Sequence, residues 1–289
     1  YYLCHHITGQ QVVFQPPIEQ RNEGIYHPDF PLDIGLEEYL EKYINPELPT
    51  VGLWFYQTYW LNNNLAFVDA IIRSVEAHGA NILPVFHLRY KDADRGNEGA
   101  DYVVKHYFME GNSPRIDVLI NPLLFSLKLA SPEYEGLLDK LGVVCIQAMM
   151  SMGPFADWLE SVQGMRTMDV SFNAAQPEFD GNLITVPVAS REQEDIDPIT
   201  GALLSKYMPI MERIDKMVRL SLNWARLRTI PNEEKKVAVV FHHYPPRDDR
   251  IGCAAGLDSF ASVIQILEQL RDQGYRVEEI YESGDHLAN

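Results

Sequence analysis

The stretch "TVGLWFYQTYWLNNNLAFVDAIIRSVEAHGANILPVFHL", Thr50–Leu88, contains two short apolar runs separated by one amphipathic segment. The runs at 51–56 and 81–87 have the length of buried strands. Between them, apolar residues recur at the spacing of one helical face: Phe67, Ala70, Ile71 and Val75. Gly79 follows as a helix-stop signal. A strand, a helix and a second strand in this order predict a βαβ unit with parallel strands.

The same alternation continues along the chain, with further apolar runs at 116–121 and 143–147 and a helical segment between them. Strands that alternate with helices predict an α/β fold with a doubly wound, mostly parallel sheet covered on both faces. At 200–228, apolar residues keep helical spacing for about seven turns, which predicts one long helix.

A charged, proline-containing link follows this helix and leads into the apolar run "VAVVF", which predicts the start of a second α/β lobe. The chain begins at Tyr1 without an initiator Met and ends just after another strand-like run, so we expect a fragment of a longer polypeptide. The expected organisation is an irregular N-terminal segment, an α/β lobe that ends in the long helix, and the start of a second βαβ lobe, at 1–45, 46–232 and 233–289.

Composition excludes several classes of function. The formal net charge of −17 repels phosphate backbones, so nucleic acid is a poor partner. The chain has no run of about eighteen apolar residues, so no membrane span is expected. The three cysteines are odd in number and lack CxxC spacing, which argues against a disulfide scaffold or a thiolate zinc site and indicates the cytoplasm.

The run "VAVVF" leads into "HHYPPRDDRIGCAAGLDSF", a strand-to-helix loop rich in groups that bind ligands. Ligands of parallel sheets sit beyond the carboxyl ends of the strands, where His242 and His243 are expected. Gly252 allows close approach of the backbone, and Arg247 and Arg250 suit a substrate with carboxylates. Histidines in such a loop are more often hydrogen-bonded structural groups than metal ligands, so a structural loop is the alternative. No GxxxxGK[ST] motif occurs in the chain, so ATP hydrolysis by this chain is not expected.

Two other clusters carry charged side chains. "NAAQPEFDG" at 173–181 places Glu178 near Asp180, either as reactive carboxylates or as an acidic surface turn. In "GIYHPDFP" at 24–31, His27 and Asp29 could bind a cation or cap a turn. Sites of histidine with carboxylate take zinc, cobalt, iron or nickel, whereas all-oxygen sites take magnesium.

Several of these stretches, in this order, resemble the large subunit of cobaltochelatase, the CobN-type family, which is related to the H subunit of magnesium chelatase. They are "GIYHPDFP", "PTVGLWFYQTYW", "NILPVFHL", "PEFDGNLIT" and "VAVVFHHYPPRDDRIGCAAGLDSF". The resemblance implies a subunit that binds a tetrapyrrole and a divalent metal, cobalt or magnesium, as substrates. It also implies that AAA+ ATPase partners hydrolyse ATP, together with accessory chelatase subunits. The last motif is nearer the cobalt pattern, whose substrate is a corrin on the route to cobalamin; the magnesium branch uses protoporphyrin.

The resemblance implies a role for Glu178, and the chemistry of metal insertion suggests roles for other residues. Glu178 lies in the motif shared by both branches and is the expected catalytic base, with His243 as its partner. His242 and His243 are the expected metal ligands. The expected substrate-binding residues are Arg247, Arg250, Gly252 and Tyr56. We expect Glu178 and the histidines to line one cleft, and the fragment alone to be inactive.

Two functions of other classes fit the same sequence. A two-lobed α/β protein can clamp a small ligand without catalysis. An acidic surface can also serve only to dock a partner such as an AAA+ ring.

Overall fold

The computed structural model describes residues 2–15, 18–31, 33–88, 91–244, 246–247, 250–279 and 281–288. The chain divides into two compact units, Tyr1–Ala225 and Arg226–Asn289, and the boundary falls inside a helix. No helix among the described residues has both the length and the apolar character that a membrane crossing requires.

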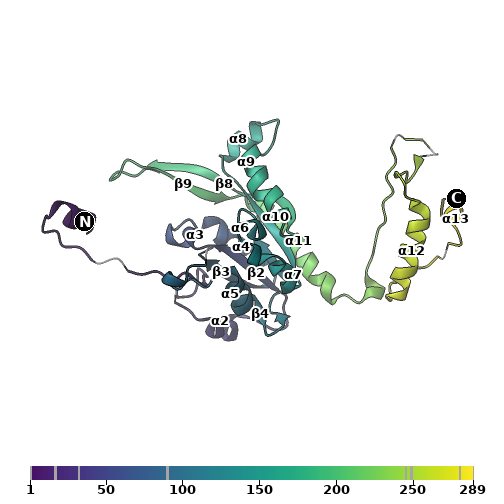
Figure 1. Cartoon of the computed structure of the whole chain (residues 1–289), viewed down its shortest axis with the longest axis horizontal. Helices are drawn as coiled ribbons and strands as arrows, with labels where there is room; N and C mark the ends of the chain where they lie inside the picture. Colours follow the sequence, from purple (N-terminus) through teal and green to yellow (C-terminus); the bar gives the residue numbers. More distant parts are fainter. Residues whose placement is uncertain are drawn as a thin grey trace. The chain divides into compact units, whose positions relative to one another are not determined.

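A seven-stranded sheet forms the centre of the first unit, in the order β1-β3-β2-β6-β7-β8-β9 (Figure 1). Its strands are β1 (Glu23–Ile25), β2 (Thr50–Tyr56), β3 (Asn81–His87), β6 (Val118–Asn121), β7 (Val144–Ser151), β8 (Leu183–Ile196) and β9 (Leu203–Pro209). The five central strands are parallel, and β1 and β9 pair antiparallel at the two edges. The predicted parallel sheet is therefore confirmed, and its four predicted strands are β2, β3, β6 and β7.

Successive residues of β2 face opposite sides of the sheet, and both sides are buried. Leu53 and Phe55 pack in one apolar core with α4 (Ala66–Ala77) and α11 (Met211–Thr229). Trp54 packs in a second core with α2 (Leu36–Tyr43), α5 (Ala100–Val103) and α7 (Leu137–Leu141). A continuous apolar strand needs this double cover, which makes the sheet doubly wound.

Short elements connect these layers. The remaining helices of the first unit are α1 (Tyr2–Thr8), α3 (Gln57–Leu61), α6 (Leu127–Ala130), α8 (Phe155–Glu160), α9 (Thr167–Val170) and α10 (Gln176–Glu178). Single turns of 3₁₀ or π geometry are η1 (Ala93–Arg95), η2 (Val104–Phe108), η3 (Pro132–Tyr134) and η4 (Ser171–Ala175), and β4 (Met109–Glu110) pairs with β5 (Ser113–Pro114). The predicted stop after α4 is confirmed, because Gly79 adopts φ 71° directly after the helix cap.

The prediction of a single long helix at 200–228 is wrong for the first part of this range. Residues 203–209 form β9, which pairs with β8, and α11 begins only at Met211. Pro209 has no N–H to donate and disfavours a helix interior, and β8 offers an open strand edge. The side chain of Asn64 also accepts a hydrogen bond from the Tyr207 N–H, 2.9 Å long, which holds β9 as a strand. The ends of β8 and β9 extend as a two-stranded arm (Figure 1).

The second unit contains η5 (Asn232–Glu234), α12 (Ser259–Asp272) and α13 (Gly284–Ala288). Asp258 caps α12, because its Oδ1 accepts a 3.0 Å hydrogen bond from the Ala261 N–H. The flanking segments 237–242 and 275–279 are predicted strands, but among the described residues they form no strand and have no ladder partner. A strand depends on hydrogen bonds to a neighbour, and Val240 is accordingly 88% exposed.

Candidate functional site

Glu178 lies at the end of a continuous helical segment formed by α9, η4 and α10. Its side chain is exposed and lines a cavity of about 300 Å³. The same cavity is also lined by Lys128, Glu135, Asp139, Phe179 and Asp180. Lys128 is paired with Glu135 at 2.6 Å, so the cavity keeps an acidic character. A carboxylate at the rim of such a cavity can accept a proton from a bound substrate.

Asp180 has a different role from Glu178, although both belong to the same sequence motif. Its carboxylate accepts hydrogen bonds from the Ser126 hydroxyl at 2.7 Å and from the backbone N–H groups of Leu127 at 2.6 Å and Lys128 at 3.1 Å. These contacts fasten the turn after Glu178 to the beginning of α6. Asp180 therefore positions the cavity wall, whereas Glu178 is exposed to the cavity.

Two buried side chains that the sequence did not single out anchor the Glu178 segment to β7. Asn173 Oδ1 accepts the Met150 N–H at 2.8 Å, and Asn173 Nδ2 donates to the Asp169 carbonyl at 3.1 Å. Asp169 Oδ1 accepts the Met152 N–H at 2.9 Å. The π geometry of η4 accommodates these contacts, and such turns are frequent at functional sites. In the sequence, the signal for this anchoring was the presence of the polar residues Asp169 and Asn173 within a helical segment.

The aromatic residues at the end of β2 are mostly engaged inside the protein. Trp54 and Tyr59 are buried, and Trp60 stacks on Phe86 with ring centroids 4.5 Å apart. The rings of Trp54 and Tyr59 are thus unavailable to a flat ligand, and one face of Trp60 is covered by Phe86. Tyr56 is half-buried, and its hydroxyl donates to the Leu124 carbonyl at 2.6 Å.

The histidine-containing loop forms a compact structure in the second unit. His242 and His243 are exposed, and the Gly252 N–H donates to the His242 carbonyl at 2.8 Å. His243 Nε2 lies 3.1 Å from the Arg247 carbonyl, and the Arg250 N–H donates to that same carbonyl at 2.8 Å. Pro245, Asp248 and Asp249 of this motif lie outside the described residues.

Gly252 is required by the conformation of this loop. Its φ is +65°, and a Cβ there would lie 2.7 Å from Phe241 Cδ1. Glu178 belongs to the first unit and the histidines to the second. The expectation that they line one cleft therefore stays a prediction.

The motif "GIYHPDFP" contributes to a third cluster, in the first unit. His27 and Asp29 meet Glu76 of α4, and one potential ligand atom from each residue lies within 4.8 Å of the others. Neither Glu76 nor its neighbour Arg73 was predicted from the sequence, where both are ordinary charged residues of an amphipathic helix.

Comparison with known proteins gives consistent matches over the whole chain. Residues 1–289 match the family model described as CobN/Magnesium Chelatase. An uncharacterized protein of Methanocaldococcus jannaschii is 33% identical over 99% of this chain and 24% of its own length. The aerobic cobaltochelatase subunit CobN of Pseudomonas aeruginosa is 31% identical over 99% of this chain and 22% of its own length.

A solved structure gives the same result. The catalytic subunit of cobaltochelatase from Mycobacterium tuberculosis superposes with a TM-score of 0.71 at 25% identity, over 99% of this chain and 22% of that chain. The chain thus spans less than a quarter of the length of each of these three proteins.

Proposed function

Because the chain belongs to the CobN/magnesium chelatase family, we propose that it forms part of the large subunit of an ATP-dependent metal chelatase. The reaction inserts cobalt or magnesium into a corrin or porphyrin ring. The family match over residues 1–289 carries this proposal. The exposed Glu178 at the rim of an acidic cavity supports it with a group suited to proton transfer.

Metal insertion makes two chemical demands on the protein. Two pyrrole N–H protons must leave the ring, and a hydrated cation must lose water. In the proposed mechanism, Glu178 accepts a ring proton as general base. His242 and His243 hold the incoming cation, and His243 can also accept a proton from the ring.

The remaining proposed site residues hold the ring. The guanidinium groups of Arg247 and Arg250 pair with ring carboxylates. Gly252 lets the backbone approach the substrate, and Tyr56 contacts it from the first unit. AAA+ ATPase partners and accessory subunits supply ATP hydrolysis, since the chain lacks a GxxxxGK[ST] motif. We place this complex in the cytoplasm.

The test is metal insertion by the full-length protein with its partner subunits. Glu178→Gln should lower turnover by about 100-fold, a usual contribution of general-base catalysis, while ring affinity stays near that of the wild type. Glu160→Gln, an exposed carboxylate at the end of α8, is the matched control and should keep full activity. Full turnover of Glu178→Gln would overturn the assignment of Glu178.

The second unit is tested in the same assay. Arg247→Ala should weaken ring binding, and His243→Ala should raise the cobalt concentration needed for half-maximal rate. Unchanged behaviour of both variants would remove the histidine loop from the proposed site. If ring binding persists while no variant affects turnover, a binding module without catalysis becomes the better account.

A further inference from the structure

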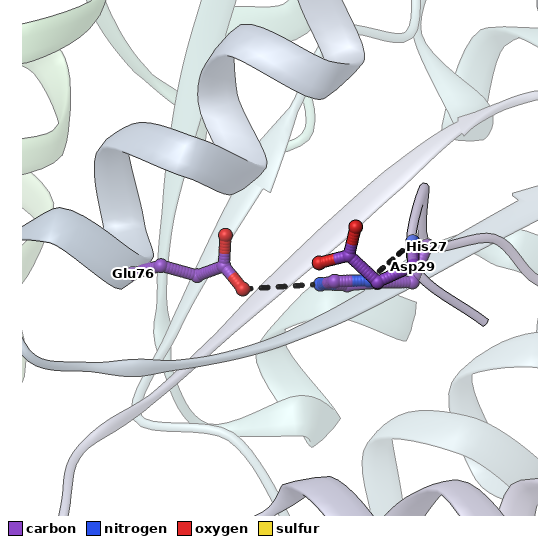
Figure 2. Close-up of side chains that lie close together, drawn as sticks. All are labelled: His27, Asp29 and Glu76. Atoms are coloured by element: carbon purple, nitrogen blue, oxygen red, sulfur yellow. Dashed lines mark hydrogen bonds and ion pairs between the residues drawn. The ribbon is translucent and has the colours of Figure 1, made fainter.

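The cluster of His27, Asp29 and Glu76 (Figure 2) shares no residue with the lining of the Glu178 cavity. His27 follows β1, which runs antiparallel to β3, and the Tyr26 N–H donates to the Pro84 carbonyl. The chain therefore runs towards the amino end of β3. Glu76 comes from the last turn of α4, which directly precedes β3. A helix C-terminus favours positive charge, so this position suits a cation.

The imidazole of His27 is held rigidly. It is 2% exposed and packs against the rings of Phe30, Tyr39 and Tyr43, with the Phe30 and Tyr43 centroids at 5.0 and 4.9 Å. The Asp29 N–H donates to Nδ1 at 3.2 Å. Nε2 therefore points at Glu76, as Figure 2 shows.

Nε2 of His27 is buried and, among the residues that the structure describes, has no hydrogen-bond partner. It lies 3.3 Å from Glu76 Oε1, but without the alignment of a hydrogen bond. Buried polar atoms are nearly always satisfied, and an unplaced ion is one recognised reason for an exception. Burial lowers the pKa of His27 below its ordinary value, although Glu76 and Asp29 oppose this shift.

A cationic side chain already pairs with the two carboxylates. Arg73 donates to both oxygens of Asp29 at 2.6 Å and to Glu76 Oε2 at 2.9 Å. The Arg73 side chain is 46% exposed, so it can turn into solvent without leaving a buried cavity. Glu76 Oε1 then keeps its 2.7 Å hydrogen bond from the Tyr43 hydroxyl and stays oriented towards His27.

We propose that His27, Asp29 and Glu76 bind a first-row divalent cation such as Co²⁺ or Zn²⁺, and that Arg73 occupies the place of this cation when no metal is bound. One imidazole nitrogen with two carboxylate oxygens suits these metals, whereas Mg²⁺ prefers oxygen ligands alone. The separation of 3.3 Å between His27 Nε2 and Glu76 Oε1 matches two ligands of one metal at bond lengths of about 2.1 Å.

Binding requires one proton to move within the imidazole. Nε2 must offer its lone pair, so the proton passes to Nδ1 and the Asp29 N–H loses its acceptor. Asp29 is exposed, and water can replace that bond. The metal carries two charges where Arg73 carried one, so the two carboxylates become fully neutralised.

The proposal predicts that removal of the Arg73 charge increases the affinity of the protein for Co²⁺. Titration of the 289-residue chain with CoCl₂, followed by calorimetry and by the visible absorption of bound Co²⁺, should show tighter binding for Arg73→Gln. The competing ion pairs of Arg73 are solvent-accessible and therefore weak, so we expect a gain of about fivefold. His27→Gln and Glu76→Gln should each remove one bound equivalent.

His78 and Asp215 provide a matched control. They also form a close pair of a histidine and a carboxylate, at 3.2 Å, but lack the second carboxylate that Asp29 adds to the proposed site. Asp215→Asn should leave Co²⁺ binding unchanged. Anomalous scattering at the cobalt edge from crystals of Arg73→Gln locates the ion among His27, Asp29 and Glu76. Unaltered affinity in Arg73→Gln, with cobalt only at other histidines, would overturn the proposal. These are equilibrium measurements, so they do not depend on the proposed chelatase activity.

Discussion

The Asp180 carboxylate accepts a hydrogen bond from the Ser126 hydroxyl at 2.7 Å, so two loops distant in sequence form one wall of the Glu178 cavity. The same carboxylate receives two backbone N–H groups of α6. Charge-assisted bonds of this kind are stronger than neutral ones. The position of Glu178 thus depends on its neighbour two residues along the chain.

Removal of the Asp180 carboxylate should loosen this wall. We expect Asp180→Ala to lower the free energy of unfolding by about 2 kcal/mol, because three donors lose their acceptor. Urea denaturation measures the change. Asp139→Ala, an exposed carboxylate of the same cavity, is the control and should cost less than about 0.5 kcal/mol. Equal stability of both variants would show that Asp180 does not hold the turn.

Loss of the Asn173 side chain should release the helical segment from β7. Asn173→Ala leaves the buried Met150 N–H without its acceptor, at a cost of about 2 kcal/mol. Hydrogen exchange at the Met150 amide should accelerate. Asn62→Ala, in an exposed turn, should leave that amide unchanged. Persisting protection at Met150 in Asn173→Ala would contradict the anchoring role.

His87 should make the stability of the first unit depend on pH. Burial lowers its pKa to about 4, against about 6.5 when unfolded, so the unfolded state binds more protons between these values. Its neutral form is fully compatible with folding above pH 6.5, and stability should fall by about 2 kcal/mol towards pH 4.5. Urea denaturation at several pH values should show a flatter profile for His87→Gln. Parallel profiles for the two proteins would refute this assignment.

Gly252 should be intolerant of a side chain for steric reasons. Gly252→Ala places a Cβ 2.7 Å from Phe241 Cδ1 in a backbone with φ +65°, and we expect a loss of about 1–3 kcal/mol. Hydrogen exchange at the Gly252 amide reports the bond to the His242 carbonyl. Gly256→Ala shares a positive φ of +73° but meets no atom within 4 Å, so it isolates the contribution of strain. Equal exchange in the two variants would exclude the clash with Phe241.

The alternation of strands and helices was predictable because it depends on neighbours along the chain. The apolar runs that form β2, β3, β6 and β7 have no polar face, so strands of this kind must be buried on both sides of the sheet. The spacing in α4 likewise gave one apolar face, and Gly79 its end. These patterns determined the class of fold without reference to any distant residue. The resemblance of the quoted motifs also led to the family, since it rests on residue identity and order.

Contacts between distant segments were decided only by the tertiary structure. Residues 203–209 had helical spacing, yet the open edge of β8 and the Asn64 side chain made them a strand. The roles of Asp180 and Asn173 depend on hydrogen bonds under 3 Å to loops and strands elsewhere in the chain. His27 likewise meets Glu76, and Asp29 meets Arg73, only because β1 pairs with β3. Periodicity places a residue on a face, but a hydrogen bond or a metal site requires atoms in register to a fraction of an ångström, which folding alone provides.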